Sequence, residues 1–269
     1  MMITIGSLFS GIGGFELGFE RGIPGSKTIW QCEQDSFCQK VLKKHWSDAI
    51  IYDDVRQITK KTVSSVDILL GGFPCQGFSN VGKMDGLNDE RSNLWWEMHR
   101  IINEIRPQIV CMENVPAITI RGGGDVISSL ASIGYDVEWS IISGREMGAP
   151  HRRDRWFAVA YSNSFRSQKI DHCTIRPQIN GERIWVQSIY CSSFNSDVRD
   201  GDTKTKNYWE KNTSPDRICR VDDGISRGMD ANRLKALGNA IVPQCSEYVA
   251  KCILHSGLID NLLQKEVTK

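Results

Sequence analysis

The chain has 269 residues, 40% of them hydrophobic, and a formal net charge of +1. This is long enough for one full α/β core with a small second lobe. We find no repeat, low-complexity tract, signal peptide or apolar run of membrane-spanning length, so we expect no membrane association. Nine cysteines, an odd number without a regular pairing pattern, favour a reducing cytoplasm, and the lack of a Cys-x-x-Cys pair argues against a metal such as zinc.

The first predicted element is a buried strand over residues 3–5, followed by a glycine loop. The loop contains Phe9, Gly11 and Gly13, and a helical pattern begins near Glu16. A strand, a glycine loop and a helix in this order are typical of a cradle for a nucleotide-like cofactor. Glu16 stands where the third glycine of a dinucleotide fingerprint would be, which argues against NAD. S-adenosylmethionine, which has adenosine but no phosphate chain, is the commonest remaining candidate.

Acidic residues follow the next two apolar stretches. Glu33 comes after residues 28–30, about 20 residues past the glycines, where an acidic side chain binds ribose hydroxyls. Asp53 and Asp54 follow residues 50–52, the third predicted strand, and either can accept a hydrogen bond from an adenine amino group. A turn or helix cap explains these two aspartates equally well.

An accessible cysteine follows the strand predicted over residues 66–70. Pro74 and Cys75 lie in the glycine-rich residues 71–79, at the sheet edge where ligands bind in open α/β folds. A thiol near backbone N–H groups or a base can lose its proton and become a nucleophile. A buried structural role is more usual for an isolated cysteine. A zinc-dependent base deaminase is excluded, because its second cysteine would fall at Phe78.

Two further motifs bring charge to the same core. A strand over residues 109–112 delivers Glu113, which must find a partner or stay protonated if it is buried. A salt bridge at the sheet edge is the alternative. Alternation over residues 153–160 predicts a strand with Arg153 and Arg155 on one face, suited to an anionic or carbonyl-rich ligand. Taken alone, this pair also fits a solvated strand face.

Together these motifs resemble the DNA (cytosine-5) methyltransferase family, of the bacterial or phage type with a short target recognition domain. The resemblance covers residues 1–160 and 226–255. Ser7 and His151 depart from it, since the family often has aspartate and glutamine there. The ordered motifs are Phe9-x-Gly11-x-Gly13, Glu33, Pro74-Cys75-Gln76, Glu113-Asn114-Val115, Arg153-x-Arg155 and residues 238–244.

The resemblance implies a fold and a division of the chain. We expect a Rossmann-like S-adenosylmethionine-dependent methyltransferase sheet with helices on both faces, plus a small, mostly irregular or β recognition lobe. Residues 1–161 would form the catalytic and cofactor-binding domain, and 162–225 the target recognition domain. Residues 226–269 would return to the catalytic domain, with helices over residues 233–237, ending at Gly238, and over residues 244–254.

The resemblance also implies a reaction. The methyl group of S-adenosylmethionine would pass to C5 of a flipped-out cytosine in a specific double-stranded DNA sequence, through a covalent adduct of Cys75 with C6. Glu113 would contact N3 and the exocyclic amine, Arg155 would hold O2, and Arg153 would support the pocket. Residues 80–92 have the composition of a lid. The cofactor would be bound by Phe9, Gly11, Gly13, Glu33, Asp54, Pro74 and Asn239.

The interval between Arg145 and Arg220 is basic, with 14 Lys and Arg against 9 Asp and Glu, which suits contacts with DNA phosphates. We expect a monomer acting on double-stranded DNA, and a cognate restriction endonuclease is a candidate functional partner that need not bind it. An RNA cytosine-5 methyltransferase of the same fold and a catalytically silent DNA-binding protein are the alternatives. The candidate phosphate contacts are Lys204, Lys206 and Lys211, and the candidate base contacts are Arg183, Asn195 and Arg199.

Overall fold

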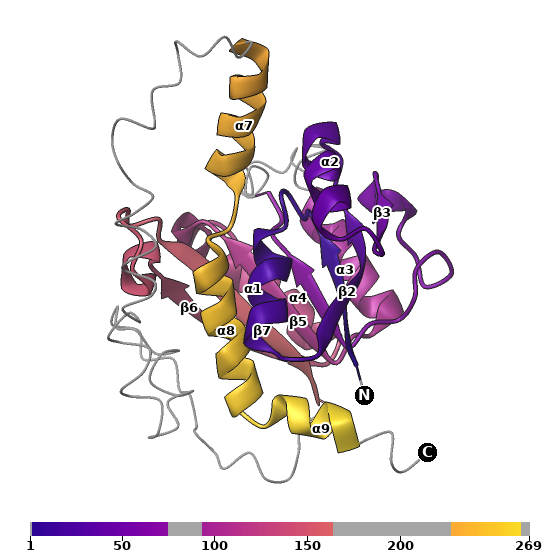
Figure 1. Cartoon of the computed structure of the whole chain (residues 1–269). Coiled ribbons are helices and arrows are strands. Elements are labelled where there is room, and N and C mark those ends of the chain that lie inside the picture. Colours follow the sequence, from indigo (N-terminus) through magenta and orange to yellow (C-terminus); the bar gives the residue numbers. More distant parts are fainter. Residues whose placement is uncertain (1, 75–92, 164–226, 265–269) are drawn as a thin grey trace, which may run out of the picture.

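The computed structural model of the chain describes residues 2–74, 93–163 and 227–264. These residues form a seven-stranded sheet with the order β3-β2-β1-β4-β5-β7-β6 (Figure 1). The first five strands are parallel, and β7 lies antiparallel between β5 and β6. The strands are β1 (Ile3–Leu8), β2 (Ser26–Cys32), β3 (Ile50–Tyr52), β4 (Ile68–Gly71), β5 (Ile109–Asn114), β6 (Tyr135–Ile142) and β7 (Arg155–Ser162).

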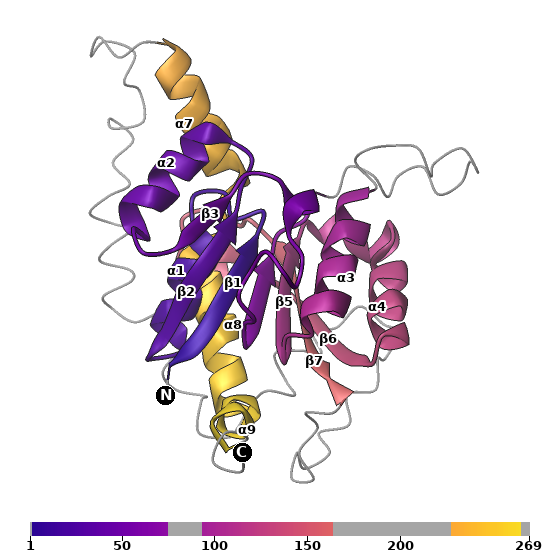
Figure 2. The same cartoon turned by 90° about the vertical axis from the view of Figure 1, so that its right-hand side faces the viewer.

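The central strands are apolar because both faces of the sheet are covered. All residues of β4 and β5 are buried, as expected for parallel strands between two helical layers. Helices α1 (Gly14–Gly22) and α8 (Pro243–His255) cover one face, and α3 (Asn93–Ile105) and α4 (Gly123–Ser132) cover the other (Figure 2). The expected Rossmann-like sheet with helices on both faces is therefore confirmed.

Glycines on one side of α1 bring α8 unusually close. Gly14, Gly18 and Gly22 are spaced four residues apart and so share one helix face. A Cβ on Gly22 would lie 2.8 Å from the Glu247 carbonyl oxygen of α8, so a larger side chain would push the helices apart. This packing places the chain near Ile241 against the start of α1, directly behind the glycine loop.

The remaining helices complete the body. Helix α2 (Ser36–His45) begins at the Asp35 cap, whose carboxylate accepts from the Phe37 and Cys38 N–H groups. Helix α7 (Arg227–Asn239) extends away from the sheet, and Lys235 Nζ lies 3.0 Å from Asp35 Oδ2 (Figure 1). Helix α9 (Leu258–Gln264) follows α8. None of the described helices combines the length and apolarity needed to cross a membrane.

One helix boundary differs from the sequence prediction. We expected Gly238 to end the helix over residues 233–237, but α7 continues through Gly238 to Asn239. Glycine stops a helix by adopting a positive φ after the last turn. Gly238 is not among the glycines with positive φ, so the helix runs past it. The strand expected from residue 153 also begins later, at Arg155.

Candidate active site

The loop after β1 has an unusual backbone. Phe9, Gly11 and Gly13 all have positive φ, at 56°, 55° and 86°. Gly13 must also be small, because its Cβ position is filled by the ring of Trp46. The Cβ position of Gly11 has nothing within 4 Å. Strained conformations of this kind cluster at ligand sites, and the loop keeps one open side.

Glu33 holds this loop in place. Its Oε2 accepts a hydrogen bond from the Gly11 N–H at 2.7 Å, and its Oε1 accepts one from the Asp35 N–H at 2.7 Å. Two residues predicted independently, one after β1 and one after β2, are therefore brought together. Each carboxylate oxygen has a second lone pair, so Glu33 keeps the capacity to accept from a ligand hydroxyl.

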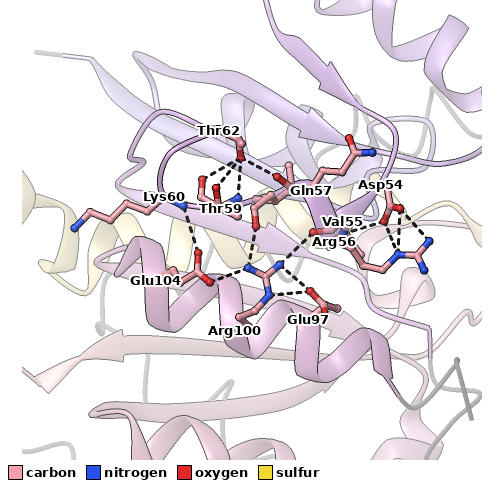
Figure 3. Close-up of polar contacts among 11 residues, drawn as sticks. Asp54, Val55, Arg56, Gln57, Thr59, Lys60, Thr62, Glu97, Arg100 and Glu104 are labelled. Atoms are coloured by element: carbon pink, nitrogen blue, oxygen red, sulfur yellow. Dashed lines mark hydrogen bonds and ion pairs between the residues drawn. The ribbon is translucent and has the colours of Figure 1, made fainter. Parts of the chain in front are cut away.

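Asp54, the third predicted cofactor residue on these strand ends, caps a short helix. It begins η1 (Val55–Gln57), accepts from the Arg56 N–H at 2.9 Å, and pairs with the Arg56 side chain at 2.9 Å. The capping explanation that the sequence left open thus accounts for its contacts. Arg100 of α3 fixes the same segment, donating to the Ile58 carbonyl oxygen at 3.0 Å between Glu97 and Glu104 (Figure 3).

An ion pair between the buried Glu113 and the partly exposed Arg155 lies at the carboxyl end of β5. Arg155 Nε is 2.9 Å from Glu113 Oε1, and Glu113 is only 9% exposed. Arg155 opens β7, which pairs antiparallel with β5, so both side chains reach the same sheet edge. Burial raises the pKa of Glu113 to about 7, although the Arg155 and Arg153 charges oppose that rise. Glu113 can therefore exchange a proton near neutral pH.

Arg153 reaches the C-terminal motif instead of sharing a strand face with Arg155. It precedes β7 and has a φ of 41°, so strand alternation does not govern its direction. Its Nη2 donates to the Gly238 carbonyl oxygen at 2.8 Å and also to that of Ala240. Asn239 lies between these two carbonyls and is itself exposed. The same-face interpretation was wrong, and the actual contact joins two motifs.

Asn114 joins Glu113 to the segment that leads to the predicted nucleophile. Its Nδ2 donates to the Phe73 carbonyl oxygen at 2.9 Å. A Cβ on Gly72 would lie 3.3 Å from Glu113 Oε2, so this glycine lets the segment pass close to the carboxylate. Pro74, which follows Phe73, is exposed. The sequence motif contains Asn114, but no local pattern reveals its role as a donor.

Comparison with known proteins shows the family of this chain. The profile of the C-5 cytosine-specific DNA methylase family matches residues 3–229. The chain belongs to this family.

The individual relatives described next are named type II methyltransferases. The type II methyltransferase M.Bsp6I of Bacillus sp. (strain RFL6) is 33% identical over 168 residues, covering 60% of this chain and 53% of the relative. The type II methyltransferase M.CviJI of Paramecium bursaria Chlorella virus IL3A is 29% identical over 243 residues, covering 90% and 56%. The chain thus spans about half the length of these two relatives.

Solved structures support the fold. The S. pombe Dnmt2 methyltransferase has a TM-score of 0.62 at 18% identity, covering 94% of this chain and 98% of that chain. The Entamoeba histolytica methyltransferase EhMeth has a TM-score of 0.62 at 18% identity, covering 97% and 99%. At these identities the comparison shows the shared fold alone.

The cysteines that the structure describes are all buried. Burial raises the pKa of each thiol, which disfavours the thiolate needed for nucleophilic attack. These thiols therefore fit structural roles, and none of them is a better candidate for the nucleophile than Cys75. The five buried cysteines are Cys32, Cys38, Cys111, Cys245 and Cys252.

The described residues contain no group of three His, Cys, Asp or Glu side chains able to hold a metal ion.

Several predicted residues lie outside the described ranges. They include Cys75 itself, the lid expected over residues 80–92, and nearly all of the recognition segment. The candidate DNA contacts Arg183, Asn195, Arg199, Lys204, Lys206 and Lys211 belong to this set. Their roles stay predictions from sequence.

Proposed function

We propose that this chain transfers a methyl group from S-adenosylmethionine to C5 of cytosine in double-stranded DNA. The observation that carries the proposal is the ion pair of Glu113 and Arg155, which lies beside the segment leading to Pro74 and Cys75. A carboxyl group that titrates near neutral pH, a fixed guanidinium and a candidate thiol suit the activation of a pyrimidine ring.

The residues at the carboxyl ends of β1, β2 and β3 fit an adenosyl cofactor. The loop from Phe9 to Gly13 is open beside Gly11, and Glu33 offers acceptors next to it. Asp54, or its exposed neighbour Asp53, lies beyond β3 for the adenine amino group. The cofactor supplies an electrophilic methyl group when bound. Pro74 and Asn239 would complete the site.

In this proposal Cys75 begins the reaction. Its thiolate adds to C6 of the cytosine, and the electron pair of the C5–C6 double bond shifts so that C5 becomes nucleophilic. C5 would take up the methyl group as the bond between that methyl and the sulfonium sulfur breaks, which leaves a neutral thioether. Loss of the C5 proton to a base and expulsion of the Cys75 thiolate then restore the aromatic ring. The buried thiols elsewhere in the described core are poor candidates for this step.

Glu113 and Arg155 would stabilise the charge that this addition creates. With a pKa of about 7, Glu113 can hold a proton close to N3 and accept from the exocyclic amine. Arg155 is oriented by Glu113 and by the Asp154 carbonyl oxygen, which Nη1 reaches at 2.9 Å. Its guanidinium would hold the O2 carbonyl, and Arg153 would brace this edge through residues 238–240.

We further propose the division of labour expected from the sequence. Residues 1–161 carry the chemistry, 162–225 read the DNA, and 226–269 return to the catalytic domain. The packing of α8 on α1 supports the last point. The target base must leave the duplex before it can reach the sheet edge, because a stacked base is inaccessible. The basic character of residues 145–220 supports phosphate contacts in the recognition segment.

The test is the product of the reaction. Bisulfite sequencing of DNA from cells that express the full chain should show 5-methylcytosine at one short sequence, and cells expressing Cys75→Ser should not. The purified protein should also be given duplex DNA and RNA with radiolabelled S-adenosylmethionine. Label in RNA alone would establish the RNA methyltransferase alternative, and label in neither would favour a silent DNA-binding protein.

A further inference from the structure

A carboxyl group outside the proposed pocket is buried beneath the glycine loop. Glu16, in the first turn of α1, has 0% exposure, and Gln31 of β2 is equally buried. Gln31 Nε2 donates to Glu16 Oε1 at 3.1 Å. In the parallel pairing of β1 with β2, Gln31 lies directly opposite Ser7. Glu16 therefore sits over the last residues of two strands, just before both enter the cofactor loop.

The second oxygen of each group accepts no hydrogen bond within normal distance from the described residues, although the Ser7 and Ser10 hydroxyls lie near enough to Glu16 to lower its pKa. Neither Glu16 Oε2 nor Gln31 Oε1 has a hydrogen-bond partner among the described residues. Both are acceptors if Glu16 is ionised, and two buried acceptors without donors are costly. The two orphan oxygens belong to the same two side chains that already share one hydrogen bond.

A single proton on Glu16 would give both oxygens a hydrogen bond. We propose that Glu16 is a neutral carboxylic acid whose O–H donates to Gln31 Oε1, and that this acid–amide pair is a positioning element for the cofactor loop. The Gln31 N–H to Glu16 Oε1 bond is one half of the pair, and the proton on Oε2 makes the other half. The positioning role rests on the proposed function, whereas the protonation state does not.

The electrostatic surroundings agree with a neutral acid. Burial raises the pKa of Glu16, and the helix backbone and the Ser7, Gln31 and Ser10 side chains offset that rise only in part. None of the described charged side chains contributes to the shift. The charged groups on the elements packed around it have partners of their own: Glu20 with Thr28 and Trp46, Glu33 with Gly11, Asp35 with Lys235, and Glu247 with Lys251.

The pair ties together the elements that form the loop. Ser7 is two residues before Phe9, and Gln31 is two residues before Glu33, which binds the Gly11 N–H. Glu16 follows the loop on α1. A hydrogen-bonded ring between Glu16 and Gln31 fixes the start of α1 against β2. It thereby fixes the separation between the glycine loop and the end of β2, which the Gly11–Glu33 hydrogen bond spans.

The protonation state can be tested through stability without any cofactor. Thermal denaturation of the full chain should be compared for wild type and Glu16→Gln from about pH 5.5 to 8. The unfolded wild type releases the proton above the ordinary glutamate pKa while the folded protein keeps it, so wild-type stability falls as pH rises. Glu16→Gln has no such proton. The melting temperature of Glu16→Gln minus that of wild type should therefore rise by about 3 °C for each pH unit.

Controls isolate Glu16 from other groups. Glu113 titrates in both proteins, so its effect cancels in the difference. Glu247→Gln removes a carboxylate that pairs with Lys251 on the surface of α8. The difference between its melting temperature and that of wild type should not change with pH. A difference for Glu16→Gln that also does not change with pH would overturn the proposal, because it would mean an ionised Glu16 held by the Ser7 and Ser10 hydroxyls.

A second measurement covers the case in which a variant folds poorly. Infrared spectra of wild type with isotope-labelled glutamate should show a buried carboxylic acid band that persists at pH 8, and Glu113→Gln and Glu138→Gln should retain it, since burial also raises the pKa of these two carboxyls. Absence of that band would also overturn the proposal. Calorimetry then tests positioning: Glu16→Ala should bind S-adenosylmethionine at least tenfold more weakly than Glu16→Gln, and equal affinities would refute this role. If no variant and no wild type binds it, the proposed function fails while the protonation result stands.

Discussion

Asn114 Nδ2 donates a 2.9 Å hydrogen bond to the Phe73 carbonyl oxygen, across 41 positions of sequence. This single bond connects the motif that carries Glu113 to the segment that leads to Cys75. Asn114 is buried, and its Oδ1 accepts from the Val115 N–H at 2.8 Å, so both ends of the amide are used. The bond adds a side-chain link to the β4–β5 pairing of Gly71 with Met112, and together they hold the Glu113 motif against this segment.

Asn114→Asp removes the donor and keeps the acceptor. The Phe73 carbonyl oxygen would then face a carboxylate and move away from it. A displacement of about 1 Å at a reacting group can slow a reaction by about a hundredfold, so we expect a loss of this order in single-turnover methyl transfer. S-adenosylmethionine affinity, measured by calorimetry, should change little. A variant with the wild-type rate would show that this bond does not set the spacing.

The second prediction concerns the pH dependence of the reaction. Burial raises the pKa of Glu113 to about 7, so the protonated form is present below that value and is lost above it. If Glu113 holds a proton at N3, the falling limb of kcat/KM should follow its ionisation. Glu113→Gln should reduce the rate by about 10²- to 10⁴-fold and remove this limb. A falling limb that survives in the variant would assign the titration to another group.

Much of this site was accessible from sequence because its signals are local. Apolar runs marked β1 to β5, and the polar residues that follow them, such as Glu33 and Glu113, lie at one sheet edge because parallel strands share it. Edge strand β6 carried no comparable run and was not predicted; Trp139 and Ile141 on it are partly exposed.

The contacts between motifs were not accessible in this way. The bond from Arg153 to the Gly238 carbonyl oxygen spans 85 positions, and no local pattern encodes it. The two-residue period of a strand predicts Arg153 and Arg155 on one face. This prediction fails because Arg153 precedes the strand and has a φ of 41°. The sequence pattern around Glu16 indicates only a missing glycine, since its partner Gln31 lies 15 positions away on β2.

The third prediction concerns the nucleophile. Cys75→Ser should abolish methyl transfer and leave cofactor binding nearly intact, because the thiolate acts on the base. DNA that contains 5-fluorocytosine should trap the wild-type protein in a covalent complex, since fluorine cannot leave as a proton does. Denaturing gels should show this complex only when S-adenosylmethionine is present. Failure to form it, or turnover by the serine variant, would refute the covalent route.

Glu33 gives the fourth prediction. Glu33→Ala removes the acceptor for the Gly11 N–H and the proposed contact with ribose, so S-adenosylmethionine binding should weaken by about 1–3 kcal/mol. Glu33→Gln keeps one carbonyl oxygen and should recover part of this loss. Calorimetry at one pH and salt concentration measures both. Unchanged affinity in the alanine variant would leave Glu33 with only its structural contact to the loop.

The last prediction separates recognition from chemistry. Residues 162–225 lie between the Arg155 motif and the C-terminal motif, and α7 and α8 bring the chain back to α1 after them. Exchanging this segment for that of a relative with another target should therefore move the methylated sequence without abolishing methylation.

Single substitutions in the same segment should behave differently. Lys204→Ala and Lys206→Ala should weaken binding to all DNA sequences alike and make its salt dependence shallower, as losses of phosphate contacts do. Bisulfite sequencing reports the target of each exchange, and binding assays at several salt concentrations report the phosphate contacts. If the exchanged protein kept its original target, recognition would have to lie in the catalytic domain, with residues 80–92 as the first segment to test.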